Sequence, residues 1–303
     1  MTEAPDRHEA AASALDRRNL IKRVGAGVAS AAALTSMAAG GLAASSTRAS
    51  AQSAGDLAIF NFALNLEYLE AEYYLRAVTG SGLSSGLTSG PGFANSVIGG
   101  SLVPFQTPAV AYYAQRIAND ELAHVEFLRA GIAAEGGVAV GEPAIDLQTS
   151  FTTLAVAAGL IVPGQTFNPF SSEVDFLLGA YIFEDVGVTA YAGAASSLAV
   201  PANMSYAASI LATEAYHSGA IRGFLSDIGG GAATNAISAL RAKLSGVQDN
   251  GTNYNGNPFN FVNADINAQA FRRTPSQVLQ IVYGGGSGGG LFFPKGVNGS
   301  ITS

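Results

Sequence analysis

The sequence predicts an all-α protein built on a four-helix bundle, with one long crossover between the second and third helices and a loop-rich C-terminal extension. Four long segments are rich in helix-forming residues and repeat apolar residues at three- and four-residue steps. The connections between them are short, long and short, which is the ordering of a bundle with a single long link. The predicted helices span residues 57–78, 107–135, 172–198 and 201–228.

The first predicted helix follows residues 53–56, whose sequence SAGD resembles a capping box. Residues 57–78 contain no Gly or Pro, so nothing inside them is expected to break the helix. The residues that share one face of this helix are Phe60, Ala63, Glu67, Glu70, Ala71 and Tyr74. Two glutamates therefore lie on the stripe that should be buried.

The other three helices begin with a capping residue or a proline: Thr107 and Pro108, Ser172, and Pro201. Residues 136–170 form the crossover between the second and third helices. Within the crossover, residues 154–162 are a short apolar run that fits either a strand or a buried helical turn.

The bundle is predicted to span residues 52–230, and the C-terminal extension residues 231–303. In the extension, residues 234–244 fit a short helix, and residues 274–283 begin with a Thr-Pro pair and fit a second one. The Gly-rich run 284–290 is interpreted as a flexible surface segment. No helix and no Lys-Ser/Thr pair follow it, as a phosphate-binding loop would require.

The first 51 residues differ from the rest of the chain. Arg17 and Arg18 precede a long uncharged run rich in Ala, Gly and Ser, which ends in an Ala-Ser-Ala sequence at Ala51. This pattern is typical of a twin-arginine export signal that is cut after Ala51. A disordered basic tail and a retained N-terminal anchor are the alternatives, the second because the run is long enough to span a bilayer. We therefore expect a periplasmic or extracellular protein that is exported already folded.

The composition excludes some classes of site and partner. The chain has no Cys, so neither a disulfide nor a thiolate metal site can form. Without the export signal, 9 basic and 18 acidic residues leave a net charge of −9, which is the wrong sign for binding a phosphate backbone. Nucleic acid is not expected as a partner, and no stable membrane insertion is expected once the signal is removed.

Outside the export signal the chain has two histidines, and each has a glutamate three residues before it. Glu121 and His124 lie in the second helix, and Glu214 and His217 lie in the fourth. Residues three apart leave the same face of a helix, so each pair points in one direction. A single pair of this kind is most often an ordinary ion pair, but two pairs on two similar helices indicate a common site.

The first and third helices repeat a second feature. Glu67 and Glu184 are each followed seven residues later by a tyrosine, at Tyr74 and Tyr191. Seven residues are two helical turns, which puts each tyrosine above its glutamate on the same face. The chain is thus a quasi-repeat of two helix pairs, each of which supplies a Glu and then a Glu-x-x-His.

Four carboxylates and two imidazoles in an apolar bundle predict a pair of metal ions. Burial of each ionised group without compensation would cost roughly several kcal/mol of solvation free energy. Two divalent cations offset that cost, since a Glu-x-x-His pair lets the carboxylate bridge both ions while the imidazole binds one. Mixed nitrogen and oxygen ligands favour Fe or Mn over Mg, Ca or Zn. The predicted cofactor is two Fe or two Mn ions.

Some neighbouring residues keep more than one interpretation. Glu70 shares the inward face with Glu67 and could replace or supplement it as a ligand. Tyr74 and Tyr191 are either core aromatics or donors of a hydrogen bond to a ligand carboxylate. Other charges on these helices are expected to be solvated: Glu72, Asp120 and Asp185.

These residues resemble the ferritin-like di-metal carboxylate superfamily, and more narrowly its desiccation-related branch. The resemblance covers most of residues 55–299. It rests on residues 61–74 (NFALNLEYLEAEYY), 120–127 (DELAHVEF), 271–284 (FRRTPSQVLQIVYG) and 292–299 (FFPKGVNG). It implies a complete set of metal ligands: Glu67, Glu121, His124, Glu184, Glu214 and His217. By the same resemblance, Glu121 and Glu214 would bridge the metals, and Glu67 and Glu184 would be terminal ligands.

The leading hypothesis is an exported protein whose di-iron or di-manganese centre reacts with oxygen or peroxide in stress or desiccation protection. The small-molecule partner would be Fe(II) and oxygen in a ferroxidase, or peroxide in a catalase. No catalytic residue beyond the metal ligands is predicted. The rival hypotheses are a structural stress protein, in which the metal only stabilises the bundle, and a vestigial, empty site. A homodimer through an exposed face of the bundle is compatible with the sequence.

Overall fold

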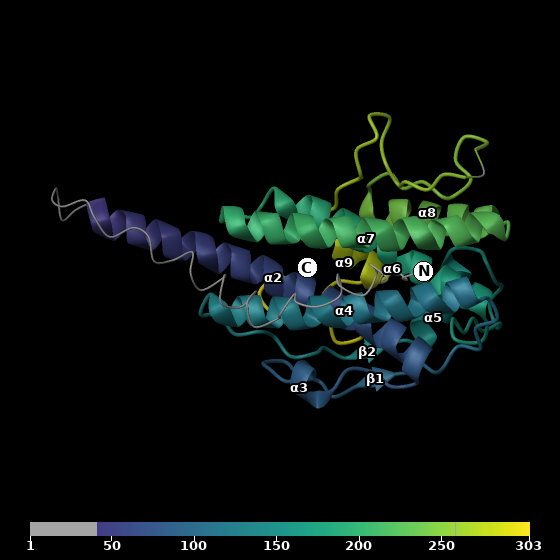
Figure 1. Cartoon of the computed structure of the whole chain (residues 1–303), viewed down its shortest axis with the longest axis horizontal. Coiled ribbons are helices and arrows are strands. Elements are labelled where there is room, and N and C mark those ends of the chain that lie inside the picture. The colour runs from purple at the N-terminus through teal and green to yellow at the C-terminus, as the bar shows by residue number, and fades with distance from the viewer. Residues whose placement is uncertain (1–40, 258) are drawn as a thin grey trace, which may run out of the picture. The chain divides into compact units, whose positions relative to one another are not determined.

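Four long helices form the predicted bundle. The computed structural model describes residues 41–257 and 259–303, with side chains from residue 54 onward. Within this part of the chain helices dominate, and α4 and α7 lie roughly parallel to each other (Figure 1). The bundle helices are α2 (Gly41–Thr79), α4 (Pro108–Ala134), α6 (Glu173–Ala195) and α7 (Pro201–Asp227). The predicted all-α class is confirmed.

The long crossover between α4 and α6 contains a helix and a short strand. Helix α5 (Thr149–Ala157) takes in the start of the apolar run at residue 154, so that part of the run is helical. Strand β2 (Ile145–Asp146) pairs in parallel with β1 (Val97–Ile98), which lies between α2 and α4. Helix α3 (Ser85–Thr88) precedes β1 in the same connection.

The first helix begins earlier than the sequence predicted, and the expected capping box is wrong. Residues 53–56 lie inside α2. The carboxylate of Asp56 instead accepts hydrogen bonds from the backbone nitrogens of Ala199 (2.8 Å) and Val200 (2.9 Å) and from the side chain of Asn203 (3.0 Å). Asp56 therefore accepts hydrogen bonds from the residues at the start of α7. The Ala-rich residues before Asp56 are good helix formers, so they extend α2 toward the N-terminus at little cost in free energy.

Most of the predicted export signal lies outside the described residues, which begin at residue 41. The predicted cut after Ala51 falls within α2. Among residues 41–257 and 259–303, none of the helices combines the length and the hydropathy that a membrane span requires.

The helix starts predicted by Ser172 and Thr274 agree with the structure. Ser172 accepts a hydrogen bond from the backbone nitrogen of Asp175 at the start of α6. Thr274 and Gln277 form a capping box at the start of α9 (Pro275–Val282). Thr107 occupies the N-cap position of α4 as predicted, but its side chain makes no capping bond.

The C-terminal extension completes the core of the bundle. Helix α8 (Gly231–Ser245) and α9 pack against α6, which is buried along most of its length. The Gly-rich run 284–290 lies at or near the surface, as predicted. The residues after it do not: Phe292 and Phe293 are completely buried, and Phe292 packs edge-on against Phe151 of α5 and Phe183 of α6.

The segment after Phe293 is fixed to the first helix of the bundle. The backbone nitrogen of Asn298 donates to Asn65 Oδ1 (2.8 Å), and Asn65 Nδ2 donates to the carbonyl of Asn298 (2.9 Å). Asn65 is completely buried in α2, two residues before Glu67. The end of the extension thus packs against the turn of α2 that carries a predicted ligand.

A buried network of charges joins the extension to the bundle, and it corrects the expectation that Asp185 is solvated. Asp185 Oδ2 lies 2.8 Å from Arg222 Nη1 and 2.6 Å from Arg241 Nη2. Asp249 in turn pairs with Arg241 and with Arg273, each at 2.8 Å. Burial alone would raise the pKa of Asp185, but the two arginines lower it. The outer face of α6 is covered by α8 and the loop after it, and a four-helix pattern alone could not predict this cover.

Candidate metal centre

The six predicted ligands come together in the middle of the bundle, although they lie far apart in the sequence. Their exposed fractions are between 0 and 8%. Each of the four bundle helices contributes at least one of them: Glu67 from α2, Glu121 and His124 from α4, Glu184 from α6, and Glu214 and His217 from α7.

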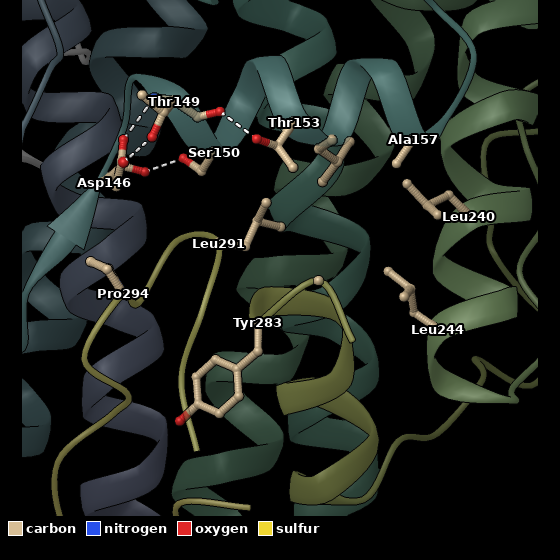
Figure 2. Close-up of a pocket in the computed structure, with 12 residues that line it drawn as sticks. Asp146, Thr149, Ser150, Thr153, Ala157, Leu240, Leu244, Tyr283, Leu291 and Pro294 are labelled. Atoms are coloured by element: carbon tan, nitrogen blue, oxygen red, sulfur yellow. Dashed lines mark hydrogen bonds between the residues drawn. The ribbon is translucent and has the colours of Figure 1, made fainter. Parts of the chain in front are cut away.

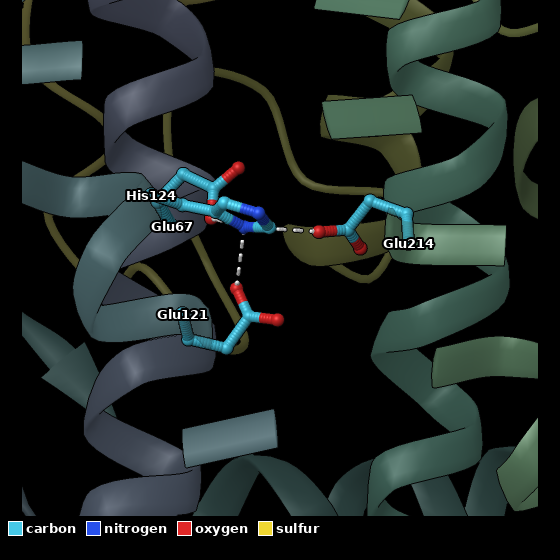
Figure 3. Close-up of side chains that lie close together, drawn as sticks. All are labelled: Glu67, Glu121, His124 and Glu214. Carbon is cyan, nitrogen blue, oxygen red and sulfur yellow. Dashed lines mark hydrogen bonds and ion pairs between the residues drawn. The ribbon is translucent and has the colours of Figure 1, made fainter. Parts of the chain in front are cut away.

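Four of these side chains form a first group, which Figure 3 shows: Glu67, Glu121, His124 and Glu214. One ligand atom from each lies within 4.8 Å of the other three. His124 Nδ1 is 3.2 Å from Glu67 Oε2 and 3.3 Å from both Glu121 Oε2 and Glu214 Oε1. One nitrogen and three oxygens thus surround a common point.

A second group has the same composition: Glu121, Glu184, Glu214 and His217. His217 Nδ1 is 2.9 Å from Glu121 Oε1 and 3.5 Å from Glu184 Oε2. Glu121 belongs to both groups and turns one oxygen toward each histidine, and Glu214 is also shared. Each group thus has one histidine nitrogen and three carboxylate oxygens, and two of the carboxylates are common to both groups. A pair of metal ions requires this arrangement.

The hydrogen bonds of the centre are incomplete in a way that fits a metal. Within the described part of the chain, seven buried side-chain atoms lack a hydrogen-bond partner, and five of them belong to this centre. They are Glu121 Oε1, Glu184 Oε2, both carboxylate oxygens of Glu214, and His217 Nδ1. Buried polar atoms are seldom left unpaired, because each costs about 1–3 kcal/mol. These oxygen and nitrogen atoms point toward a common space but form no hydrogen bonds with one another, so they are suited to bind a cation there.

The pKa values of side chains in the centre are raised, which means that the centre favours the binding of protons or other positive charge. Burial raises the pKa of Glu67 to about 7, although the nearby His124 opposes the rise. Burial and the charges of other carboxylates raise the pKa of Glu214 well above its ordinary value. Burial would lower the pKa of His124 and of His217, but the surrounding carboxylates outweigh it and raise both. Divalent cations would supply the charge that protons otherwise provide here.

The two tyrosines hold the terminal glutamates crosswise. Tyr74 on α2 donates a hydrogen bond to Glu184 Oε1 on α6, and Tyr191 on α6 donates to Glu67 Oε1 on α2. Each glutamate keeps its other oxygen toward a histidine. Burial raises the pKa of both tyrosines, so they remain donors. The seven-residue spacing was therefore informative, but each tyrosine binds the glutamate of the opposite helix and not its own.

Glu67, and not Glu70, contributes to the first group. Glu70 is nevertheless buried beside the centre, with 5% of its surface exposed. Burial, followed by the charges of Glu214 and Glu121, raises its pKa well above the ordinary value. Burial and the neighbouring carboxylates therefore favour the protonated form of Glu70, next to the candidate ligands.

Sequence reasoning missed two residues of the centre. Gly187 on α6 leaves room for Glu214, because a Cβ at this position would collide with Glu214 Oε2. A glycine inside a helix was the available signal, since it costs about 1 kcal/mol without a packing reason. Asp120 was expected to be solvated, but it is half-buried, and its Oδ2 lies 3.3 Å from His217 Nε2. Its partner lies on another helix, which sequence spacing cannot reveal.

A further buried carboxylate without a full set of partners lies outside the centre. Glu142 is 3% exposed, and its Oε1 has no hydrogen-bond partner among the described residues. It faces Glu72, which is also buried, contrary to the prediction, because Arg76 Nε (2.6 Å) and the backbone nitrogen of Leu83 (2.7 Å) bind it. Burial and the charge of Glu72 raise the pKa of Glu142 from 4.5 to about 8.

This shift predicts a pH dependence of stability. The folded state holds the Glu142 proton more tightly than the unfolded state, so the free energy of unfolding falls as pH rises from about 5 to about 8. Glu142→Gln keeps the side chain neutral at every pH. We expect the variant to match the wild type at pH 5 and to be more stable by on the order of 4 kcal/mol at pH 9. Urea unfolding across this range measures the difference, and two parallel stability curves would contradict the prediction.

A cavity of about 340 Å³ lies between α5, the end of α8 and the segment after α9 (Figure 2). Its hydroxyl groups are already paired: Thr149 and Ser150 bond to Asp146, and Thr153 bonds to the carbonyl of Thr149. Leucines complete much of the lining. The cavity does not include any of the six predicted ligands.

Comparison with known proteins agrees with this geometry. Residues 55–227 match the family model described as a ferritin-like domain. The desiccation-related protein PCC13-62 of Craterostigma plantagineum is 31% identical over 250 residues, which cover 74% of this chain and 76% of that protein. The ferritin-like catalase Nec2 of Nesocodon mauritianus is 28% identical over 275 residues, which cover 82% of this chain and 85% of that protein. No solved structure matches the chain.

Proposed function

This chain belongs to the family of ferritin-like domains, in its desiccation-related branch, and on that premise we propose that it is a di-metal oxidoreductase that removes peroxide. The cofactor would be two Mn or two Fe ions. Peroxide disproportionation is preferred to Fe(II) oxidation because one relative is named a ferritin-like catalase. The other relative is named for desiccation, which agrees with the proposed role in stress protection.

One observation carries the proposal, namely the two groups of ligand atoms that share Glu121 and Glu214. Glu67 and His124 would complete one metal position, and Glu184 and His217 the other. When bound, such a pair of ions would supply the two electrons that one peroxide molecule gains as it becomes water, and would accept the two electrons that the next one loses as it becomes dioxygen. A single group would offer one ion and no partner for it.

The surroundings of the centre restrict the substrate. All six ligands are buried, and His124, at 8%, is the most exposed of them. A molecule the size of peroxide or dioxygen is therefore favoured over an organic substrate. Tyr74 and Tyr191 would keep the terminal glutamates in place throughout the reaction, because each donates to the oxygen that faces away from the histidine.

Peroxide disproportionation also moves protons, and Glu70 is placed to hold one. Its Oε1 lies near the position that Gly187 leaves open for Glu214. It is not needed by either ligand group. The Glu70 carboxyl group would give its proton to an oxygen released when the O–O bond of peroxide breaks, and its carboxylate would take a proton from the next peroxide molecule as that molecule is oxidised to dioxygen.

Export by the twin-arginine route is part of the proposal. It is supported by Arg17, Arg18 and the uncharged run that ends at Ala51. That route generally carries folded proteins, which suits a metal centre that closes inside a bundle. Mass spectrometry of the exported protein tests it, because a mature N-terminus at Gln52 is expected.

The experiment that tests the metal centre compares the wild type with the Glu121→Ala/His124→Ala variant. Both proteins are purified from the exported fraction and analysed for Fe and Mn. We expect about two ions per wild-type chain, and none bound stoichiometrically in the variant, because the variant lacks a shared carboxylate and one imidazole. Peroxide consumption and Fe(II) oxidation are then measured on both. Circular dichroism checks that the variant remains helical.

Each outcome decides between the hypotheses. Unchanged metal content in the variant would refute the assigned ligands. Metal in the wild type with neither activity would favour a structural stress protein that the metal only stabilises. Iron oxidation without peroxide consumption would replace the catalase proposal with a ferroxidase.

A further inference from the structure

The two halves of the metal centre are alike in their ligands but differ in what supports their histidines. Superposing Glu121 on Glu214 also superposes His124 on His217, and it places Asp120 on Thr213. The quasi-repeat therefore has a carboxylate on α4 where it has a hydroxyl on α7. This is the position immediately before each shared glutamate.

Asp120 supports the histidine of the other helix. Its Oδ2 lies 3.3 Å from His217 Nε2, while His217 Nδ1 faces Glu121 and Glu184. Arg116 Nε holds the same carboxylate oxygen at 2.8 Å. A carboxylate on Nε2 fixes the proton there and leaves the Nδ1 lone pair directed at the metal position.

His124 lacks this support. Its Nδ1 faces three carboxylates, but no hydrogen bond to its Nε2 is present among the described residues. Its side chain is 10% exposed, against 5% for His217. Thr213 corresponds to Asp120. Its hydroxyl donates a hydrogen bond to the carbonyl of Ser209 in the same helix. Ser209 corresponds in turn to Arg116, so the whole Arg-Asp pair is missing from α7.

We propose that Asp120 is a positioning residue that makes the two metal positions unequal, with the position of His217 and Glu184 binding its ion more tightly than the position of His124 and Glu67. This inference rests on the proposed di-metal function. Partners of metal-bound histidines typically contribute about 10–100-fold in metal affinity. The centre would then fill in two steps, and the ion at His124 would be the one that exchanges.

The test is a calorimetric titration of the full, metal-free protein with Mn²⁺ under anaerobic conditions. The wild type should bind two ions in two resolved steps whose dissociation constants differ by about 10–100-fold. Asp120→Asn should weaken the tighter step by that factor and leave the weaker one unchanged, so the two steps merge. Asp120→Glu, which keeps the charge, should restore part of the difference.

The chain offers a matched gain-of-support variant. Ser209→Arg/Thr213→Asp places the same pair on α7, in the position that the quasi-repeat relates to His124. The weaker step should then tighten by about 10–100-fold. Electron paramagnetic resonance at one Mn²⁺ per chain gives a second measurement. The wild type should show mainly singly loaded protein, and Asp120→Asn should show a mixture of empty, singly and doubly loaded forms.

The outcomes separate this inference from the proposed function. If the wild type binds no Mn²⁺ and no Fe²⁺, the proposed function fails. If it binds two ions of equal affinity, or if Asp120→Asn weakens both steps equally, the inference alone is overturned. Thermal unfolding of each metal-free variant shows whether a change in affinity reflects a change in folding.

Discussion

Removal of the metal should lower the melting temperature of this protein by about 15–30 °C. An ion present at about 1,000 times its dissociation constant stabilises the folded state by about 4 kcal/mol, so two ions contribute about 8 kcal/mol. For a domain of this size, 1 kcal/mol corresponds to about 2–4 °C. The effect is large because the shared carboxylates of Glu121 and Glu214 are completely buried. Differential scanning calorimetry with and without a chelator measures it.

The Glu121→Ala/His124→Ala variant is the control for this prediction. It should unfold at the same temperature with and without the chelator, since it has no stoichiometric metal to lose. Restoring Mn²⁺ or Fe²⁺ should recover the wild-type melting temperature and leave that of the variant unchanged. A wild type that releases its metal without any change in melting temperature would contradict the prediction.

Asp185→Asn should destabilise the protein by about 3–5 kcal/mol. Asp185 is 1% exposed and pairs with Arg222 and Arg241, which are also buried. Removal of one member of a buried ion pair leaves the other charges uncompensated, and this costs about 3–5 kcal/mol. Asp249 cannot replace it for Arg222, since the only contacts of Asp249 with arginine in the described network are to Arg241 and Arg273. Urea unfolding of the metal-free proteins measures the difference.

Arg116→Gln provides the comparison for an exposed pair. Arg116 also binds an aspartate at 2.8 Å, but its side chain is 65% exposed. Exposed pairs of this kind contribute about 0–1 kcal/mol, so the free energy of unfolding of this variant, compared with the wild type in the metal-free state, should barely change. Equal losses in the two variants would show that burial of the Asp185 network does not matter for stability.

The candidate ligands could be recognised from sequence because helix periodicity is a local property. Glu121 and His124 are three residues apart, and so are Glu214 and His217, which fixes each pair on one face whatever surrounds the helix. The choice between Glu67 and Glu70 could not be made in this way, since both lie on the inward face of α2. Only the position of α4 and α7 decides that Glu67 joins the ligand group.

The tyrosines show where local geometry stops being sufficient. Two turns of helix separate Tyr74 from Glu67 by about 11 Å along the axis, which is too far for a hydrogen bond. The crosswise bonds of Tyr74 to Glu184 and of Tyr191 to Glu67 require α2 and α6 to run in opposite directions side by side. Spacing revealed which residues mattered, and the packing of the two helices determined their partners.

The largest errors concern residues whose partners lie in the C-terminal extension. Asp185 looked solvated because the polar face of a bundle helix normally meets water. Here Arg241 of α8 and the loop after it cover that face. Phe292 likewise belongs to the extension that was predicted to be rich in loops, and it packs on Phe151 and Phe183. Such contacts between distant segments leave no periodic signal in the sequence.

The contact between Asn298 and Asn65 has a consequence for the timing of assembly. Residues 292–299 are synthesised after every helix of the bundle, yet they complete the packing around the first of them. A nascent chain that has just emerged from the ribosome with all four bundle helices would still lack these contacts beside Glu67. Under the proposed di-metal function, the ligand group of Glu67 would therefore be complete only after translation has passed residue 299, and its ion would bind after translation.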